Sequence, residues 1–336
     1  MEKEKIFRLT GTSRIVDFSA DGSLIIIGDH DGGFKVYDIA RNVINCKTRL
    51  KGPRSDLVIN NQDISSDNRY AAFSCLHKVF VMDISKKEVI REFDFSGEER
   101  QASVPFCLFR QSPQLLIPNG DNLLIHHIDT DESRSITLPG GAGWTDCVAV
   151  SPDDALVAYK SNNDGLDDRI FIYDARTGKH QYTIMVPYPS VRGRQVFICR
   201  NIRFVDNDTL LVLRKGIGLS YFRISTGSEI LTRTWDDMGF KSVHSFWDAK
   251  ISVDAHEVLF RAETPDPGYP DEWYVNVADG YEYVLYDIIH NKILFRTRLG
   301  ESPACFHLPS GQLASIKTEY GKGRSRYLVI EEMKTT

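Results

Sequence analysis

The residues of this chain best suited to chemistry are adjacent pairs of histidines and of carboxylates. His126 and His127 are the only adjacent histidines, and imidazole is the commonest metal ligand in proteins. Neighbouring residues of a β-strand point to opposite faces, so these two rings are not expected to share a metal ion. The aspartate pairs at 153–154 and 167–168 lie in predicted turns, where Asp is common for backbone reasons. None of these pairs therefore predicts a local catalytic or metal site.

Two glycine-rich segments raise the question of phosphate binding. Residues 140–143 read GGAG and residues 321–325 read GKGRS. A phosphate loop needs a strand before it and a helix after it, so that backbone amides and the helix dipole meet the anion. Neither segment has a predicted helix behind it, and we interpret both as turns. The chain also lacks the H-E-x-x-H and G-x-S-x-G signatures.

An acidic segment could attract calcium. Its carboxylates are Glu263, Asp266, Asp271, Glu272, Asp279 and Glu282. Calcium takes about six to eight oxygen ligands, and this segment lacks the D-x-D-x-D spacing that supplies them in one loop. We expect a solvated acidic loop, and the chain as a whole predicts no cofactor, no metal and no catalytic activity.

The composition is typical of a globular protein that does not bind nucleic acid in general. The 336 residues are 42% hydrophobic and 26% charged, with a formal net charge of −5. Six widely spaced cysteines form no C-x-x-C pair and are expected to be core thiols of a reducing compartment. The chain shows no secretory signal and no apolar run long enough to span a membrane. We expect a cytoplasmic protein, with the nucleus as the alternative.

A repeat of 45 or 46 residues runs through the first half of the chain. Short apolar segments end in Asp38, Asp83, Asp129 and Asp174, and a further copy ends in Asp287. Arg223 stands where the intervening Asp is expected. A turn rich in Ser, Asp, Pro and Gly precedes each marker, as in SADG at 19–22 and SPDD at 151–154. Because the markers end strands and begin turns, we interpret them as turn residues rather than catalytic acids.

Each repeat reads as four short strands bounded by turns. The first repeat contains RIVDF, SLIIIG, FKVYD and VINCKTRL, all rich in Val, Ile, Tyr and Phe. Seven such units predict an all-β fold, a seven-bladed β-propeller with four-stranded blades. The last unit supplies only three strands, so the N-terminal KIFRLTG is expected to close the last blade. We expect one domain, 1–336, with blades at about 12–50, 57–95, 103–138, 144–186, 198–235, 246–299, and 302–336 plus 4–10.

These repeats resemble the WD-repeat family of β-propellers. The S-x-D-G-like turns and the markers at 37–38, 82–83, 173–174 and 286–287 carry the resemblance, which covers essentially the whole chain. The family's Trp-Asp marker and its Gly-His dipeptide are absent, so the repeats are degenerate. The resemblance implies a scaffold subunit that binds other proteins within a larger complex.

The places where the period stretches predict a binding surface. Long segments at 161–168 and 263–281 fall between second and third strands, and those at 186–197 and 236–247 join blades. All four are expected to leave one face of the ring over blades four to six. Long loops on a rigid scaffold often bind partners, and aromatic and Arg residues are typical interface anchors. The predicted partner-binding residues are Tyr188, Arg192, Arg194, Trp247, Tyr269, Trp273 and Tyr274. The alternative is that the aromatic residues pack the loops onto the ring.

Two other functions stay open. An enzyme or small-ligand site could assemble at the channel mouth from different blades. Its candidate residues lie near the starts of inner strands: Arg14, Asn61, Asp146, Arg200 and Asp248. Mixed charges are also expected of a wet channel lining. Nucleic-acid binding through Arg192, Arg194, Arg200 and Arg203 is a weaker alternative, because the chain is acidic overall.

Overall fold

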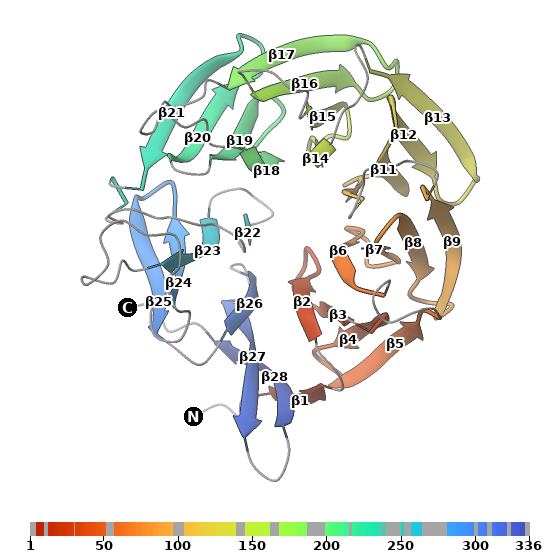
Figure 1. Cartoon of the computed structure of the whole chain (residues 1–336), viewed down its shortest axis with the longest axis vertical. Coiled ribbons are helices and arrows are strands. Elements are labelled where there is room, and N and C mark those ends of the chain that lie inside the picture. The colour runs from red at the N-terminus through yellow and green to blue at the C-terminus, as the bar shows by residue number, and fades with distance from the viewer. Residues whose placement is uncertain are drawn as a thin grey trace.

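A ring of seven four-stranded antiparallel sheets forms the protein (Figure 1). The computed structural model describes all residues except 1–4, 10–12, 30, 52–56, 97–103, 139–144, 162–167, 187–198, 215–216, 236, 239–249, 252–256, 264–280, 299–301, 308–310, 321–323 and 333–336. The described part contains strands and turns but no helix, and therefore no helix that could cross a membrane. The all-β, seven-bladed architecture is as predicted.

Each blade is a meander whose first strand lies nearest the centre of the ring (Figure 1). Blade one contains β2 (Ser13–Phe18), β3 (Leu24–Asp29), β4 (Gly33–Asp38) and β5 (Val43–Arg49). Blade two contains β6 (Ile59–Ile64), β7 (Tyr70–Cys75), β8 (Lys78–Asp83) and β9 (Glu88–Asp94). Blade three contains β10 (Cys107–Leu108), β11 (Gln114–Asn119), β12 (Asn122–His127) and β13 (Glu132–Thr137).

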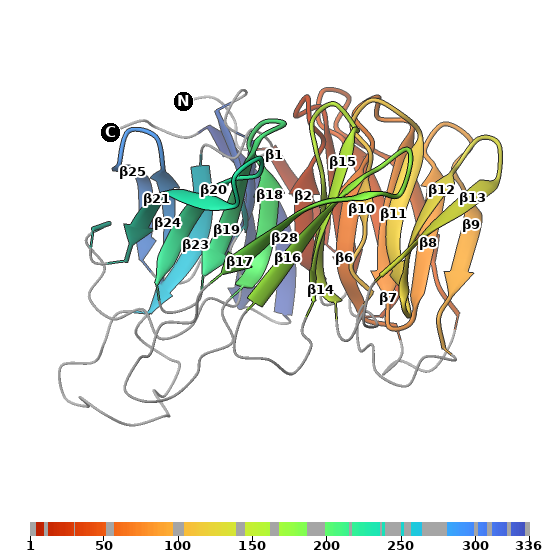
Figure 2. The same cartoon turned by 90° about the horizontal axis from the view of Figure 1, so that it is seen from above.

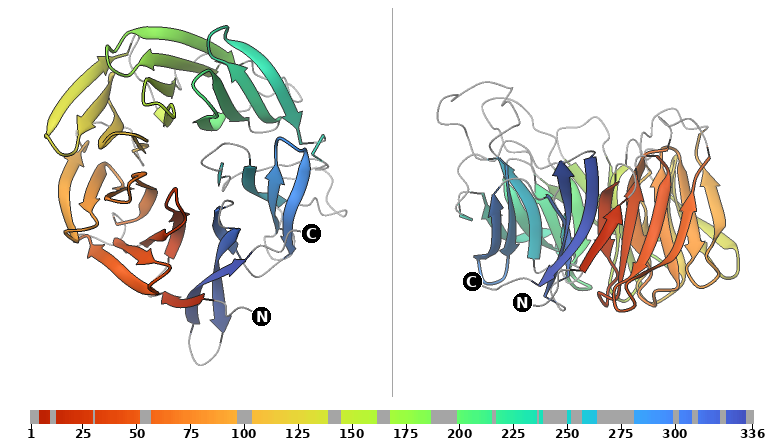
Figure 3. Two further views of the ribbon diagram at one scale, coloured as in Figure 1. Left: turned by 180° about the vertical axis from the view of Figure 1, so that it is seen from behind. Right: turned by 90° about the horizontal axis from the view of Figure 1, so that it is seen from below.

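The remaining blades repeat the same order (Figure 3). Blade four contains β14 (Thr145–Val150), β15 (Leu156–Ser161), β16 (Asp168–Asp174) and β17 (His180–Val186). Blade five contains β18 (Cys199–Phe204), β19 (Thr209–Arg214), β20 (Gly218–Arg223) and β21 (Ser228–Thr234). Blade six contains β22 (Lys250–Ile251), β23 (Glu257–Glu263), β24 (Tyr281–Asp287) and β25 (Lys292–Arg298). Blade seven contains β26 (Ser302–His307), β27 (Gln312–Tyr320), β28 (Arg324–Glu332) and β1 (Lys5–Leu9).

The N-terminal strand closes the ring, as predicted. β1 pairs antiparallel with β28, with Phe7 opposite Leu328. Leu9 is buried in the cluster of apolar residues between blades seven and one, which includes Val16 and Leu328. Closure joins the two ends of the chain in one sheet, and it removes the open edge that an unclosed array would expose.

The core of the molecule is divided among the interfaces between neighbouring blades. Phe34 of blade one stacks on Phe73 of blade two, with ring centroids 4.2 Å apart. The second strands β3 and β7 are buried along their whole length, which explains their nearly continuous apolar sequences. The fourth strands lie at the circumference and are mostly exposed. Each blade therefore depends on both neighbours for its core.

The Ser-x-Asp turns have a common hydrogen-bond pattern that explains their recurrence. The Ser19 hydroxyl donates to Asp21 at 2.7 Å and accepts the Leu24 N–H at 2.9 Å. Ser65 and Ser151 make the same two bonds in blades two and four. The fourth residue of each of these turns has a positive φ, which explains the Gly, Asn or Asp found there.

The repeated aspartates cap the turns between third and fourth strands. Asp38 accepts the Arg41 N–H at 2.8 Å, and Asp174 accepts the Thr177 N–H at 2.6 Å. Asp83 accepts the N–H groups of Ser85 and Lys86, each at 3.0 Å. The interpretation of these markers as turn residues is therefore confirmed.

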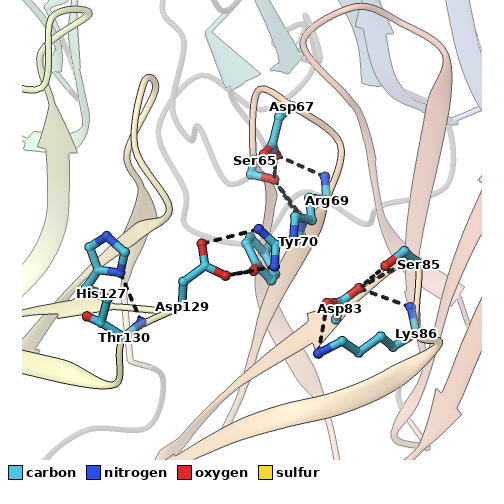
Figure 4. Close-up of polar contacts among 10 residues, drawn as sticks. All are labelled: Ser65, Asp67, Arg69, Tyr70, Asp83, Ser85, Lys86, His127, Asp129 and Thr130. Carbon is cyan, nitrogen blue, oxygen red and sulfur yellow. Dashed lines mark hydrogen bonds and ion pairs between the residues drawn. The ribbon is translucent and has the colours of Figure 1, made fainter.

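The marker of blade three is His127, and its assignment to Asp129 was wrong. His127 pairs with the first residue of the second strand, Gln114, just as Asp83 pairs with Tyr70. Its Nδ1 accepts the Thr130 N–H at 3.3 Å, the bond that a carboxylate makes in other blades (Figure 4). A histidine occupies the marker position of blade three. The sequence pattern, which looks for Asp, therefore pointed to Asp129, two residues later.

Candidate functional site

Eight strand ends define one face of the ring over blades four to six. The long connections leave from β15, β17, β21 and β23 and enter β16, β18, β22 and β24. In an antiparallel four-stranded blade, the connection from the second to the third strand and the connection from the fourth strand to the next blade lie on the same face of the ring. We call this face the insertion face (Figure 2). The connecting segments lie outside the described residues, and so do all seven predicted partner-binding residues: Tyr188, Arg192, Arg194, Trp247, Tyr269, Trp273 and Tyr274.

The channel-mouth candidates lie where the inner strands begin, at the insertion face. Arg14, Asp146 and Arg200 each fall within a β-bulge between the first and second strands of their blade. Blades two and seven have a bulge at the same level. Bulges re-aim side chains and are common beside functional sites. Sequence reasoning found these positions but could not find the bulges, because register depends on the neighbouring strand.

Asn61 holds two blades together. Its Nδ2 donates to the Ser74 hydroxyl and to the Val104 carbonyl, both at 3.2 Å. The second bond ties blade two to the segment that enters blade three. This amide therefore has a structural role, whereas Asp248 lies outside the described residues.

Exposed apolar side chains gather on the outer strands of blades four and five. Tyr182 and Met185 on β17 and Ile230 and Leu231 on β21 are between 36% and 47% exposed. We call these four residues the rim patch. The two strands are linked, because the turn at Gly227 of blade five lies against the Thr183 carbonyl of β17. Sequence reasoning missed this patch.

A sequence signal for the rim patch exists in β17. Its residues HQYTIMV include no Lys, Arg, Asp or Glu, whereas every other outer strand of the ring carries at least one. Charged residues normally protect an edge strand from pairing with another chain. The outer edge of blade four therefore lacks the usual charge protection.

Polar residues at the opposite face, which we call the turn face, hold blades two and three together (Figure 4). Tyr70 and Arg69 of blade two both donate to the Asp129 carboxylate of blade three. Burial and the Asp129 carboxylate raise the pKa of the Tyr70 hydroxyl, so it stays protonated. Tyr70, Arg69 and Asp129 are thus engaged with one another, and their role is to join blades two and three.

The pairs His126–His127 and Asp153–Asp154 serve local structure, whereas the side chains of the 167–168 pair lie outside the described residues. His126 Nδ1 lies 2.8 Å from the Ser133 hydroxyl, while His127 caps its turn. Asp153 bonds Ser151, and Asp154 accepts the N–H groups of Arg110 and Gln111. Among the residues that the structure describes, no group of three or more His, Cys, Asp or Glu is placed to hold a metal ion.

Ionisable residues recur at one register position of the inner strands, farther along each strand than the predicted mouth residues. Asp17, Asp63, Cys107 and Arg203 occupy equivalent register positions on the inner strands of blades one, two, three and five. Arg110 follows β10 and interacts electrostatically with Asp63 and Arg203. We call these five residues the channel cluster. Arg203, a candidate for a nucleic-acid surface, thus lies half-buried on the inner strand of blade five.

The channel cluster has perturbed protonation equilibria. Burial raises the pKa of Asp63, while Arg110, the Leu108 N–H and Arg203 oppose that rise. Burial and the nearby Arg110 guanidinium lower the pKa of Arg203 to about 10. Burial raises the pKa of the Cys107 thiol to about 11, so this thiol is not an activated nucleophile at neutral pH.

Comparison with known proteins gives the fold. No family model matches the sequence, and no curated protein matches it. Among solved structures, the chain is similar to the β-propeller domain of Cps50 (Swd1) from Myceliophteria thermophila, with a TM-score of 0.65 and 16% identity. The match covers 98% of this chain and 100% of that domain. At this identity the similarity establishes the β-propeller fold and nothing beyond it.

Proposed function

We propose that this protein is a non-catalytic interaction module, a scaffold subunit that binds a partner protein or peptide over blades four to six. The observation that carries the proposal is the coincidence of two features on these blades. Four long connections leave one face of them, and the rim patch lies on the outer strands of two of them. Exposed apolar side chains on neighbouring blades are a feature of interaction surfaces.

The proposed contact residues are the aromatic and arginine side chains of the long connections. Trp273, Tyr269, Tyr274, Trp247 and Tyr188 offer large apolar surfaces, and Arg192 and Arg194 offer bidentate donors. We further propose that the chain is a degenerate WD-repeat propeller working in the cytoplasm or nucleus. The Ser-x-Asp turns, the Asp caps and the similarity to the Swd1 propeller domain support the first part of this proposal.

The test is quantitative affinity capture from the native cell, read by mass spectrometry. Wild type is compared with Trp273→Ala, Arg194→Ala and the rim double variant Tyr182→Ser/Met185→Ser. The matched control is Val43→Ser/Ile44→Ser, which removes comparable exposed apolar surface from blade one. We expect the same proteins to be lost from the first three variants and kept by the control. Equal recovery in all variants would exclude this surface.

A second candidate function is a small-ligand or catalytic site at the insertion-face mouth of the channel. The recurrent bulges at Arg14, Asp146 and Arg200 favour it, since bulges are over-represented beside functional sites. Native mass spectrometry of protein purified from its own cells tests it. A bound small molecule that disappears in Arg14→Ala and Arg200→Ala is the expected result. A ligand-free wild-type protein contradicts this candidate.

A further inference from the structure

We propose that His126 is a pH-sensitive latch between blades two and three, a regulatory device separate from the proposed interaction surface. The two blades are neighbours in the ring (Figure 1). With a neutral ring at His126, the Asp131 carboxylate of blade three pairs with Arg91 of blade two. When His126 takes up a proton, its ring attracts Asp131 and repels Arg91, and the ion pair between the blades is lost.

His126 is held in the interface by neighbours on three strands. The residue is 3% exposed, and on β12 it lies opposite Leu115, a member of the apolar cluster between blades two and three. Its ring meets the Phe93 ring of β9 edge to face, with the ring centroids 4.9 Å apart. Its Nδ1 lies 2.8 Å from the Ser133 hydroxyl of β13. These contacts hold the imidazole in one orientation.

The other ring nitrogen, Nε2, is aimed at the ion pair. It is buried, and no group among the described residues forms a hydrogen bond with it. The Oδ1 atom of Asp131 lies 3.6 Å from this nitrogen and 2.9 Å from the Nε of Arg91. Charge-assisted N–H···O bonds are about 2.7–2.9 Å long, so a movement of less than about 1 Å would join a protonated ring to the carboxylate. His126 and Arg91 would then compete for the same oxygen.

The Asp131 carboxylate is free to move above a fixed backbone. Asp131 lies in the turn between β12 and β13, where its φ is 63° and its N–H donates to the His127 carbonyl at 3.0 Å. Its side chain is 62% exposed. The Arg91 side chain is 33% exposed, and its guanidinium group also donates to the Ile90 carbonyl at 2.9 Å. The carboxylate can therefore turn from one cation to the other without unfolding the turn.

Protonation of His126 should also weaken the folded state. Burial lowers the pKa of His126 from its ordinary value of 6.5, Asp131 opposes this change, and Arg91 and His127 add to it. The residues opposite the ring on β11 and β13, Leu115 and Ser133, carry no charge. Because the folded protein favours the neutral ring, this part of its stability is complete above pH 6.5. It is lost as the pH falls through 6.5 toward the lower folded-state pKa.

The experiment measures the coupling between Arg91 and Asp131 at two pH values. Urea unfolding midpoints of wild type, Arg91→Gln, Asp131→Asn and the double variant form a double-mutant cycle, recorded at about pH 7.5 and about pH 5. The same cycle is repeated in a His126→Gln background, where the amide keeps hydrogen-bonding groups but does not titrate. We expect coupling at the higher pH in both backgrounds. At the lower pH it should disappear with His126 in place and persist with His126→Gln.

The second background separates the latch from direct titration of the carboxylate. Protonation of Asp131 itself would reduce the coupling equally in both backgrounds. No coupling at the higher pH, coupling that is unchanged at the lower pH with His126 in place, or an equal loss in both backgrounds would overturn the proposal.

Nuclear magnetic resonance of the wild-type protein tests the latch without relying on the stability of any variant. We expect the His126 ring to titrate below pH 6.5, and the Nε–H signal of Arg91 to shift with the same midpoint. The control is His180, an exposed ring on the outer strand of blade four, whose own midpoint should have no counterpart at Arg91. A His126 ring that stays neutral down to about pH 5, or that titrates with no change at Arg91, would overturn the proposal.

Discussion

At the scale of single residues, the repeated side chains act on the backbone around them. Asp83 is almost fully buried, accepts two turn N–H groups and receives the Ser85 hydroxyl. In blade five Arg223 replaces the marker Asp. There the Asp208 carboxylate caps the turn instead and accepts the Ser225 N–H at 2.7 Å. In both blades a carboxylate thus caps the turn between the third and fourth strands, although the residue that supplies it differs.

Replacing the cap of blade two should cost stability. Asp83→Ala leaves the N–H groups of Ser85 and Lys86 without their acceptor, and we expect a loss of about 1–3 kcal/mol in the free energy of unfolding. Urea denaturation measures it. Asp206→Ala serves as the control, since that exposed carboxylate accepts one N–H group in a turn. An equal effect of both changes would contradict the special role of Asp83.

Blade three offers the converse change. His127→Asp would place a carboxylate where Thr130 now donates to a ring nitrogen at 3.3 Å. A charged acceptor binds backbone N–H groups more strongly, so we expect a higher unfolding midpoint at neutral pH. Asp129→His is the contrasting variant, and it should lower the midpoint because Tyr70 and Arg69 lose their shared acceptor. A lower midpoint for His127→Asp would show that His127 is not the marker.

The turn face should lose stability in acid. Partial burial raises the pKa of Asp21, but hydrogen bonds from Ser23, Ser19 and Asn68 outweigh it and lower the pKa to about 2. A depressed folded-state pKa stabilises the native state above the ordinary value of 3.8, and this contribution disappears as the pH falls toward about 2. Unfolding midpoints measured across this range should fall less steeply for Asp21→Asn than for wild type. Parallel curves would contradict the assignment.

At the scale of strands and blades, periodic spacing made the fold predictable. The interval of about 45 residues between successive markers predicted the number of blades, and the missing strand of the last unit predicted closure by the N-terminal strand, residues 5–9. Contacts between blades were not predictable in this way. The bulges at Arg14 and Arg200, the Asn61 bond to the Val104 carbonyl and the rim patch all depend on which strand lies beside which, and local periodicity does not contain that information.

Removal of the closing strand should weaken the whole ring. Deletion of residues 2–10 exposes the edge of β28 and removes Leu9 from the interface between blades seven and one. We expect a markedly lower melting temperature in calorimetry. Deletion of residues 2–4 alone keeps β1 and provides the control. An unchanged melting temperature after the longer deletion would contradict closure by β1.

At the scale of the whole molecule, the proposed interaction surface lies on one part of the ring. Hydrogen bonds of Asn61, Asp129 and Asn68 join blades one, two and three. Blades four to six carry the long connections and the rim patch. We therefore expect partner binding to protect blades four to six rather than blades one to three.

Hydrogen exchange of the protein, free and within its captured assembly, tests the central claim most directly. The account predicts slower amide exchange in the assembly along β17, β21 and the connections at 187–198, 239–249 and 264–280, with exchange in blades one to three unchanged. Protection confined to blades one to three, or no protection on blades four to six, would contradict it.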